Sequence, residues 1–331
     1  MNEMECGFIE SFKSYKSLEI KSRNIDFLIK WLHDVYKIAY LPCTDPNLRE
    51  KLAVDKVKLS IFNILLDDLA DNSEIRDKEL LEEAIKISKN GSKKQTHPYL
   101  ILAQKMWEEC IESIKQYPRY EEFKEIFDFD MDQFVDSIKY SYLVNTNGID
   151  NDFETQLYSA HNMMVMIFTD MDIMCSPDFD RKELRKIRPI QYSVQEITHI
   201  GNIVATYPRE IKEKDYSSPI INYAIREGII QKETVENEPE TALRKLEALV
   251  PFLKMKVECN FEKIEEQAKE VKTVDVIEFS SRVRLIWEGF LNRAQNWKTT
   301  EIFPEDEPQT TMTLKPTVKI VHNNAVKWLR I

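Results

Sequence analysis

Apolar residues recur every three or four positions along most of the chain, a spacing typical of helices with one buried face. Five segments show it clearly: residues 24–40, 97–117, 131–144, 240–272 and 274–297. Each has roughly the length of an ordinary helix or of two joined helices. We therefore predict a protein built from long amphipathic helices.

Short polar stretches separate these segments and are typical of loops. They fall at residues 41–47, 90–98, 145–152 and 174–180. Pro251 lies inside segment 240–272. Because proline lacks a backbone N–H and clashes with the preceding turn, we expect a bend there.

The composition supports an all-α fold. Only 6 of the 331 residues are glycine, whereas sheet-rich folds need glycine in tight turns and bulges. No internal repeat and no stretch resembling an interdomain linker interrupts the chain. We predict a single domain over residues 1–331, a bundle of about ten helices, with residues 1–20 and 304–331 as mobile or capping segments.

Charge and cysteine usage narrow the class of protein. The chain carries 46 basic and 57 acidic residues, a net charge of −11, which argues against nucleic acid as a partner. Its five cysteines are scattered and form neither a zinc motif nor a disulfide framework. The N-terminus has no apolar signal core, and no run is long enough to span a membrane. We expect a cytoplasmic protein.

One helical segment ends in a cluster of acids. In "IFNILLDDLADNSEI", residues 61–75, an apolar run is followed by Asp67, Asp68 and Asp71. Asp67 and Asp71 share a helix face, where like charges repel, and they lie near the helix end that disfavours anions. A hard divalent cation such as Mg²⁺ would resolve the conflict, because it prefers carboxylate oxygens. The alternative is a helix end whose acids are simply hydrated.

A second stripe of oxygen-bearing side chains lies later in the chain. In "HIGNIVATYPREIKEKDYSS", residues 199–218, Asn202, Thr206 and Glu210 stand four apart. On a helix they form one polar face suited to Mg²⁺. Either stripe alone is weak, since surface helices often produce such patterns. Two of them in one all-α chain favour a shared metal site.

With both motifs the sequence resembles a class I terpene synthase of the microbial type. "DDLAD" (67–71) is similar to the aspartate-rich motif D-D-x-x-D of that family, and "NIVATYPRE" (202–210) to its second metal motif, N-D-x-x-S/T-x-x-x-E. Chain length, helical pattern and motif order agree, so the resemblance covers roughly the whole chain. It implies a helical bundle around an apolar central cavity, three Mg²⁺ ions and an isoprenyl diphosphate substrate.

The resemblance also implies roles for individual residues. Asp67 and Asp71 are expected to bind metal and act in catalysis, with Asp68 supporting them. Arg209 matches the position of a basic residue that contacts the diphosphate. The remaining implied metal ligands, which also serve catalysis, are Asn202, Thr206 and Glu210.

Aromatic side chains are candidates for the cavity wall, because aromatic faces stabilise carbocations. The candidates are Phe62, Trp287, Phe290 and Trp297. For each of them an ordinary place in the hydrophobic core is the alternative, and the general preference of aromatic residues for the interior favours it.

The chain departs from the family in several places. Ile203 replaces the aspartate of the second motif, and Pro208 predicts a kink in that helix. The arginine that senses diphosphate has no counterpart in residues 156–172, where His161 or Asn162 takes its place as a substrate-binding candidate.

The late Arg-Tyr pair of the family is also missing, with Phe303 in its position. Other basic residues, Arg209, Lys212 or Lys214, could compensate for these losses. A divergent enzyme with a different trigger and a weak or inactive enzyme are the other two explanations.

The function implied by the resemblance is Mg²⁺-dependent terpene cyclisation, a carbon–oxygen lyase reaction on a phosphate ester. Farnesyl or geranylgeranyl diphosphate would be ionised and the carbocation cyclised to a sesquiterpene or diterpene, with release of diphosphate. A trans-prenyltransferase or a squalene-synthase-like enzyme would need a second aspartate-rich motif. A catalytically silent scaffold could use the charged faces of residues 79–94 and 260–275, although such faces are usually only solvated. Substrate length, product and oligomeric state stay open, a homodimer included.

Overall fold

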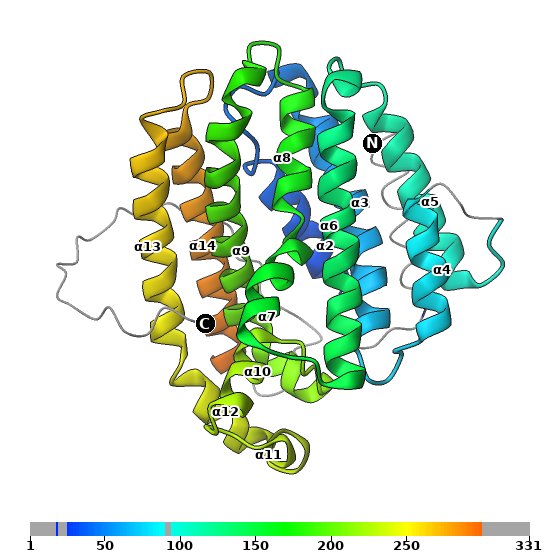
Figure 1. Ribbon diagram of the computed structural model, residues 1–331, viewed down its shortest axis with the longest axis vertical. Coiled ribbons are helices and arrows are strands. Elements are labelled where there is room, and N and C mark those ends of the chain that lie inside the picture. Colours follow the sequence, from blue (N-terminus) through cyan, green and yellow to red (C-terminus); the bar gives the residue numbers. More distant parts are fainter. Residues whose placement is uncertain (1–17, 19–24, 90–93, 300–331) are drawn as a thin grey trace.

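The computed structural model describes residue 18 and residues 25–89 and 94–299, with only the backbone described for residues 25–27 and 295–299. These residues form thirteen α-helices, three short 3₁₀ helices and no β-strand (Figure 1). The all-α prediction is therefore confirmed for the described part of the chain. The segments predicted as mobile or capping lie almost wholly outside it.

The helices follow one another with short connections. The α-helices of the first half are α2 (Ile25–Tyr36), α3 (Arg49–Asp71), α4 (Lys78–Ser88), α5 (Pro98–Ile114), α6 (Tyr120–Asn147), α7 (Asp152–Tyr158) and α8 (Val165–Met174). Those of the second half are α9 (Leu184–Glu213), α10 (Pro219–Arg226), α11 (Lys232–Asn237), α12 (Pro239–Glu247), α13 (Val250–Ala268) and α14 (Val276–Thr299). The 3₁₀ helices are η1 (Pro46–Leu48), η2 (Ser159–Met163) and η3 (Arg181–Glu183).

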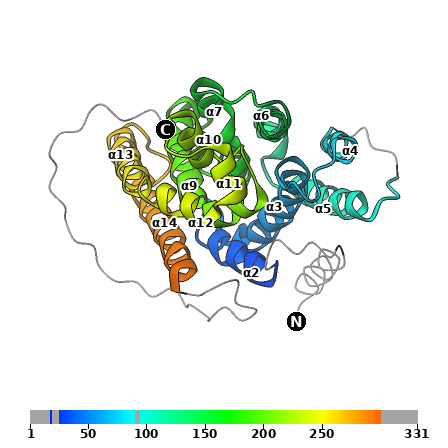
Figure 2. The ribbon, with the colours of Figure 1, turned by 90° about the horizontal axis from the view of Figure 1, so that it is seen from below.

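The longest helices lie alongside one another and share a buried core. Helix α9 packs against α8, α13 and α14, and α3 packs against α2, α5 and α6. One hydrophobic cluster runs through all of these contacts. The short helices α10, α11 and α12 lie together at one end of the bundle, which is seen from below in Figure 2. At this same end α3, α6 and α9 reach their C-termini (Figure 1).

Local sequence explains several helix boundaries. Helix α6 ends at Asn147, and the next residue, Gly148, has a left-handed φ of 62° that suits glycine and donates its N–H to Val144 O at 3.0 Å. Asp77 caps α4 by accepting a hydrogen bond from Leu80 N (2.9 Å). Helix caps of this kind keep the connections short, so that consecutive helices can pack together.

Helix boundaries differ from the sequence prediction mainly where a segment contains short helices. Segment 240–272 is two helices, α12 and α13, so the chain breaks at residues 248–249, just before Pro251, and does not bend within one helix at Pro251. Pro251 lies in the first turn of α13, where the missing N–H has no partner to lose. Helix α6 is longer than the predicted 131–144. Helix α9 continues through both Pro189 and Pro208.

No described helix is both long enough and apolar enough to cross a lipid bilayer.

A close approach of two helices makes Gly201 sensitive to substitution. A Cβ placed on Gly201 of α9 would lie 2.4 Å from Cδ2 of Phe290 on α14. Phe290 is itself held against Trp31, with ring centroids 4.9 Å apart. We expect Gly201→Ala to lower the free energy of unfolding by about 1–3 kcal/mol, because overpacking outweighs the gain in helix propensity of about 1 kcal/mol.

Urea denaturation would measure this loss, and Phe290→Leu supplies the matched test. In the Phe290→Leu background the alanine should cost less, since the smaller side chain leaves room for the methyl group. A Gly201→Ala protein as stable as the unmodified one would contradict the predicted close contact.

Candidate functional site

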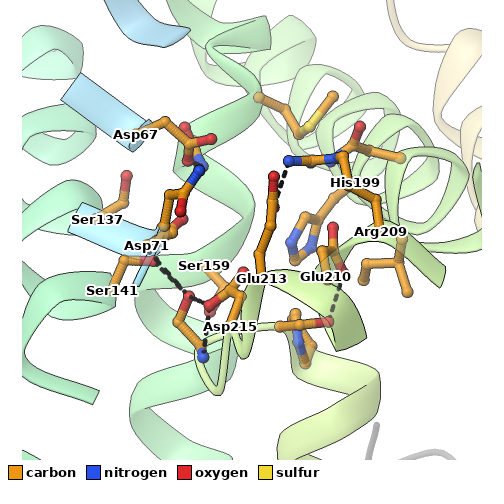
Figure 3. Close-up of a pocket in the computed structure, with 18 of the residues that line it drawn as sticks. Asp67, Asp71, Ser137, Ser141, Ser159, His199, Arg209, Glu210, Glu213 and Asp215 are labelled. Atoms are coloured by element: carbon orange, nitrogen blue, oxygen red, sulfur yellow. Dashed lines mark hydrogen bonds and ion pairs between the residues drawn. The ribbon is translucent and has the colours of Figure 1, made fainter. Parts of the chain in front are cut away.

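A polar pocket lies at the end of the bundle where α3, α6 and α9 terminate. It measures about 690 Å³ when its open mouth is included. Six acids line it: Asp67, Asp68, Asp71, Glu210, Glu213 and Asp215. The basic residues in its lining are Arg209 and His199. Carboxylates and the C-terminal turns of α3 and α9 therefore meet in one space, which favours cations there; Figure 3 shows the carboxylates around it.

The two motifs found in the sequence meet in this pocket. Asp67 and Asp71 come from the last turn and a half of α3, and Asn202 and Glu210 come from α9. Thr206 lies between the last two and contacts both. The helical spacing that placed each motif on one face is thus observed.

Asp67 is hydrogen-bonded by a residue of η2, just before Met164 interrupts the helical structure between η2 and α8. The Asn162 side-chain amide donates to Asp67 Oδ1 (2.7 Å), and the Asn63 amide donates to the Asn162 carbonyl (2.8 Å). At the break Met164 has a φ of 55°, in the left-handed region that residues other than glycine seldom adopt. This backbone is strained, and strain of this kind is common at functional sites.

Asp71 shares its hydrogen-bond partners with Asp215. The Asn145 amide lies 3.4 Å from Asp71 Oδ1 and 3.0 Å from Asp215 Oδ1. The Ser217 hydroxyl lies 3.3 Å and 2.6 Å from the same two oxygens. Burial raises the pKa of Asp71 well above its usual value, and the charges of Asp215 and Asp67 raise it further. Burial raises the pKa of Asp215 as well.

Glu210 is enclosed by hydroxyl groups. Its two oxygens lie 2.5 Å from Thr206 Oγ1 and 2.6 Å from Ser218 Oγ. Thr206 Oγ1 is also 2.7 Å from the Asn202 carbonyl. A hydroxyl has one proton, so when Thr206 donates to Asn202 the short contact requires a proton on Glu210. Burial, followed by the charge of Asp215, raises the pKa of Glu210 to about 7.

The buried carboxyl of Glu210 predicts how stability depends on pH. Its pKa is about 7 in the folded protein against a usual 4.5, so the protonated form is favoured by folding. The stability that this provides is present below about pH 4.5 and is lost as pH rises through 7, up to about 3 kcal/mol. We expect the metal-free protein to melt at a lower temperature at pH 8 than at pH 5.5.

Glu210→Gln is the control, because glutamine keeps the shape without the titration. The difference in free energy of unfolding between this variant and the unmodified protein should widen from pH 5.5 to pH 8. Thermal melts across that range would measure it. A constant difference between the two proteins would show that Glu210 does not titrate as described.

Basic groups in the pocket are already engaged or neutral. The Arg209 guanidinium donates to Glu213 Oε2 (2.5 Å), so it offers little free positive charge to the pocket. His199 presents part of its surface to the pocket, yet burial lowers its pKa to about 4 and keeps it neutral. Lys212 and Lys214, considered as replacements for the missing arginines, are exposed and do not line the pocket.

The other substrate-binding candidates lie apart from the pocket lining, except Asn162. His161 faces α9, where its Nδ1 is 3.4 Å from Gln195 Nε2 and its ring packs edge-on against Tyr192. Phe62 packs against Trp107 of α5, with ring centroids 5.2 Å apart.

The remaining aromatic candidates do not line the pocket in the described part of the chain. Trp287 lies in the main hydrophobic cluster, and Phe290 packs against Gly201 and Trp31. The side chain of Trp297 and all of Phe303 lie outside the described residues. The pocket lining is mainly polar, with Met163, Ile203 and Pro219 as its apolar members. The apolar central cavity therefore stays a prediction.

The donor atoms fit Mg²⁺ in chemistry, since carboxylate, amide and hydroxyl oxygens are the ligands it prefers. Asn63 Oδ1 and Asn162 Oδ1 beside Asp67 are buried without a hydrogen-bond partner, which leaves amide oxygens available. Among the described residues, however, no three His, Cys, Asp or Glu side chains are already gathered for a metal ion. Asp67 and Asp71 are hydrogen-bonded to each other, and the hydroxyls of Thr206 and Ser218 occupy the two oxygens of Glu210, so metal binding would require these side chains to turn.

Several site residues escaped the sequence analysis. Asp215, Ser217 and Ser218 lie in the short connection after α9, and Asn145 and Ser141 lie near the end of α6. In the sequence, the polar run "KDYSSP" (214–219), three residues after the second motif, was the feature that indicated Asp215, Ser217 and Ser218. Comparison with protein-family models and with curated proteins finds no match to this chain.

Proposed function

We propose that this protein is a Mg²⁺-dependent class I terpene cyclase that ionises a linear isoprenyl diphosphate and cyclises the resulting carbocation. One observation supports the proposal most strongly: residues of two oxygen-rich motifs, on helices that are far apart in the sequence, line one acidic pocket. Six acids against Arg209 and a neutral His199 would repel a diphosphate unless several divalent cations entered with it. That charge balance is what a metal-bound diphosphate substrate needs.

The residues of the pocket would act on the head of the substrate. Asp67 and Asp71 on one side, and Asn202, Thr206 and Glu210 on the other, would hold Mg²⁺. When bound, Mg²⁺ would supply charge stabilisation to the leaving diphosphate. Arg209 could turn from Glu213 to a phosphate oxygen, since both lie at the pocket surface. Asn162, already hydrogen-bonded to Asp67, would position that carboxylate.

The reaction itself would follow from the loss of diphosphate. The allylic C–O bond breaks and its electron pair leaves with diphosphate. The carbocation then forms new C–C bonds at the expense of C=C bonds. It ends by losing a proton to a base or by capturing water and then losing a proton. Water has to be kept from the early cation, which requires an apolar enclosure for the hydrocarbon chain.

The first experiment is a direct assay. Purified protein would be incubated with geranyl, farnesyl and geranylgeranyl diphosphate, each with Mg²⁺ and each with EDTA, and the extracts analysed by gas chromatography. A cyclic hydrocarbon or alcohol from one substrate, absent with EDTA, would support the proposal and give the chain length. An elongated diphosphate formed with added isopentenyl diphosphate would indicate a prenyltransferase instead.

Binding separates the remaining outcomes. Mg²⁺-dependent binding of inorganic diphosphate without any product would indicate an unusual substrate or a trigger lost with the sensor arginine. No product and no Mg²⁺-dependent binding would overturn the cyclase proposal and favour a helical scaffold.

A further inference from the structure

A second group of buried polar side chains lies between α6, α8 and α9, outside the pocket lining. Its outer part is an ion pair, in which the two terminal guanidinium nitrogens of Arg188 donate to Asp130, each at 2.8 Å. The Gln133 amide also donates to Asp130 (2.8 Å). Asp130 is 1% exposed, and its charge is satisfied by these partners.

Asp170 of α8 lies beside this pair and is only partly satisfied. It is 2% exposed and hydrogen-bonded to Asp130. Its Oδ2 atom is buried and has no hydrogen-bond partner. Burial and the charge of Asp130 raise the pKa of Asp170 well above its usual value. A neutral Asp170 would donate its proton to Asp130 and keep Oδ2 as an acceptor.

Gln191 of α9 is the other unsatisfied member. It is 0% exposed, and both its Oε1 and its Nε2 lack hydrogen-bond partners. Buried polar atoms are rarely left in this way, because each costs about 1–3 kcal/mol.

The register of the two helices brings Asp170 and Gln191 to the same level. Helices α8 and α9 pack together and are joined by a short connection, so they run antiparallel. Met166 N donates to Gln195 Oε1 across them (3.4 Å). Asp170 is four residues after Met166 and Gln191 is four residues before Gln195, so each lies about one helical turn nearer the connection between α8 and α9. Arg188, Gln191 and Gln195 stand three and four residues apart on α9 and share one face, so Gln191 lies between the ion pair that Asp170 contacts and the Met166–Gln195 contact.

We propose that Asp170 and Gln191 bind a buried water molecule between α8 and α9. A water can donate to Asp170 Oδ2 and to Gln191 Oε1 while it accepts from Gln191 Nε2. These are three hydrogen bonds, the usual number for an internal water. A metal cation fits less well, because the Arg188 guanidinium and the Gln191 N–H donor face the same group.

The site has a structural role that does not rest on the proposed function. Helix α8 starts directly after Met164, whose backbone is strained. Just before Met164, η2 contains Asn162, which donates a hydrogen bond to Asp67. Water between α8 and α9 would fix α8 at a second level, one turn beyond the Met166–Gln195 contact. It would thereby fix the position of α8 directly after Met164.

A crystal structure of the full chain at a resolution that shows ordered water provides the direct test. We expect one density peak within hydrogen-bond distance of Asp170 Oδ2 and the Gln191 amide. A direct Asp170–Gln191 hydrogen bond with no water, or an empty gap between the two side chains, would overturn the proposal.

A double-mutant cycle tests the same site in solution. Asp170→Leu and Gln191→Met should each lower the melting temperature, and the double variant should lose less than the sum of the two losses. For comparison, Thr169→Val removes a hydroxyl that bonds within its own helix (Val165 O, 2.8 Å). It should be additive with Gln191→Met. Additive losses for Asp170→Leu with Gln191→Met would contradict a shared water.

Discussion

Under the proposed function, Asp67→Ala is expected to lower sharply the Mg²⁺-dependent release of diphosphate from the substrate that the assay identifies. The carboxylate lines the acidic pocket, where it accepts a hydrogen bond from the Asn162 amide (2.7 Å) and is also hydrogen-bonded to Asp71. Loss of a metal ligand removes several kcal/mol of transition-state stabilisation. Each 1.36 kcal/mol is tenfold in rate, so turnover should fall by more than about a hundredfold.

The control for this variant is an acid that takes no part in the pocket. Asp136 on α6 has a half-exposed side chain paired with Lys139 at 3.1 Å. Asp136→Ala should keep turnover near that of the unmodified protein, and both variants should keep the helical circular dichroism spectrum. Full turnover in Asp67→Ala would remove the aspartate-rich motif from the mechanism. An equal loss in both variants would point to a general effect of charge.

The two motifs could be predicted from sequence because helical periodicity alone sets which residues share a face. Asp67 and Asp71 are one turn apart on α3, and Asn202, Thr206 and Glu210 follow one face of α9. No long-range contact is needed for that inference. It also explains why the all-α fold was evident, since the same period runs through the long helices.

The rest of the pocket depends on contacts between residues distant in sequence. Asp215 and Asp71 share Asn145, yet these three residues come from a loop and two helices. Nothing in their local sequence indicates that they meet. Phe62 is another example. The helical period of apolar residues predicts that Phe62 is buried, but it does not indicate that Trp107 is its neighbour. Pro251 indicated an interruption, but proline at a first turn and proline at a bend look alike in sequence, so the start of a new helix at Val250 was not predicted.

A buried ion pair outside the pocket should have the largest effect on stability. Lys56 of α3 is fully buried, and its Nζ donates to Asp172 Oδ1 of α8 (2.6 Å) and to the Ala39 carbonyl (2.9 Å). The Leu41 N–H donates to the other oxygen of Asp172 (3.1 Å). Lys56→Met would leave the Asp172 charge in the core without its cation. We expect a loss of about 3–5 kcal/mol in the free energy of unfolding near neutral pH.

The sign of the pH dependence follows from the state of Asp172. Burial raises its pKa to about 6 even with Lys56 beside it, and without Lys56 the folded pKa should rise further. A carboxyl with a raised folded pKa is favoured when protonated, so stability falls as pH rises. The loss in Lys56→Met should therefore be smaller at pH 5 than at pH 7.5 in urea denaturation. A loss that is independent of pH would mean that Asp172 is not the group left unpaired.

Two further variants test whether the Lys56–Asp172 ion pair contributes net stability to the fold, or whether Lys56 is needed only because Asp172 is buried. Lys56→Met with Asp172→Leu removes both charges and should recover most of the lost stability, because apolar side chains of similar volume pack in their place. Lys139→Met, which breaks the exposed pair with Asp136, should cost less than about 1 kcal/mol. If the double variant stayed as unstable as Lys56→Met, packing of the lysine side chain would be the main contribution. The double variant also removes the hydrogen bond that the Leu41 N–H donates to Asp172, so that bond would contribute to the same loss.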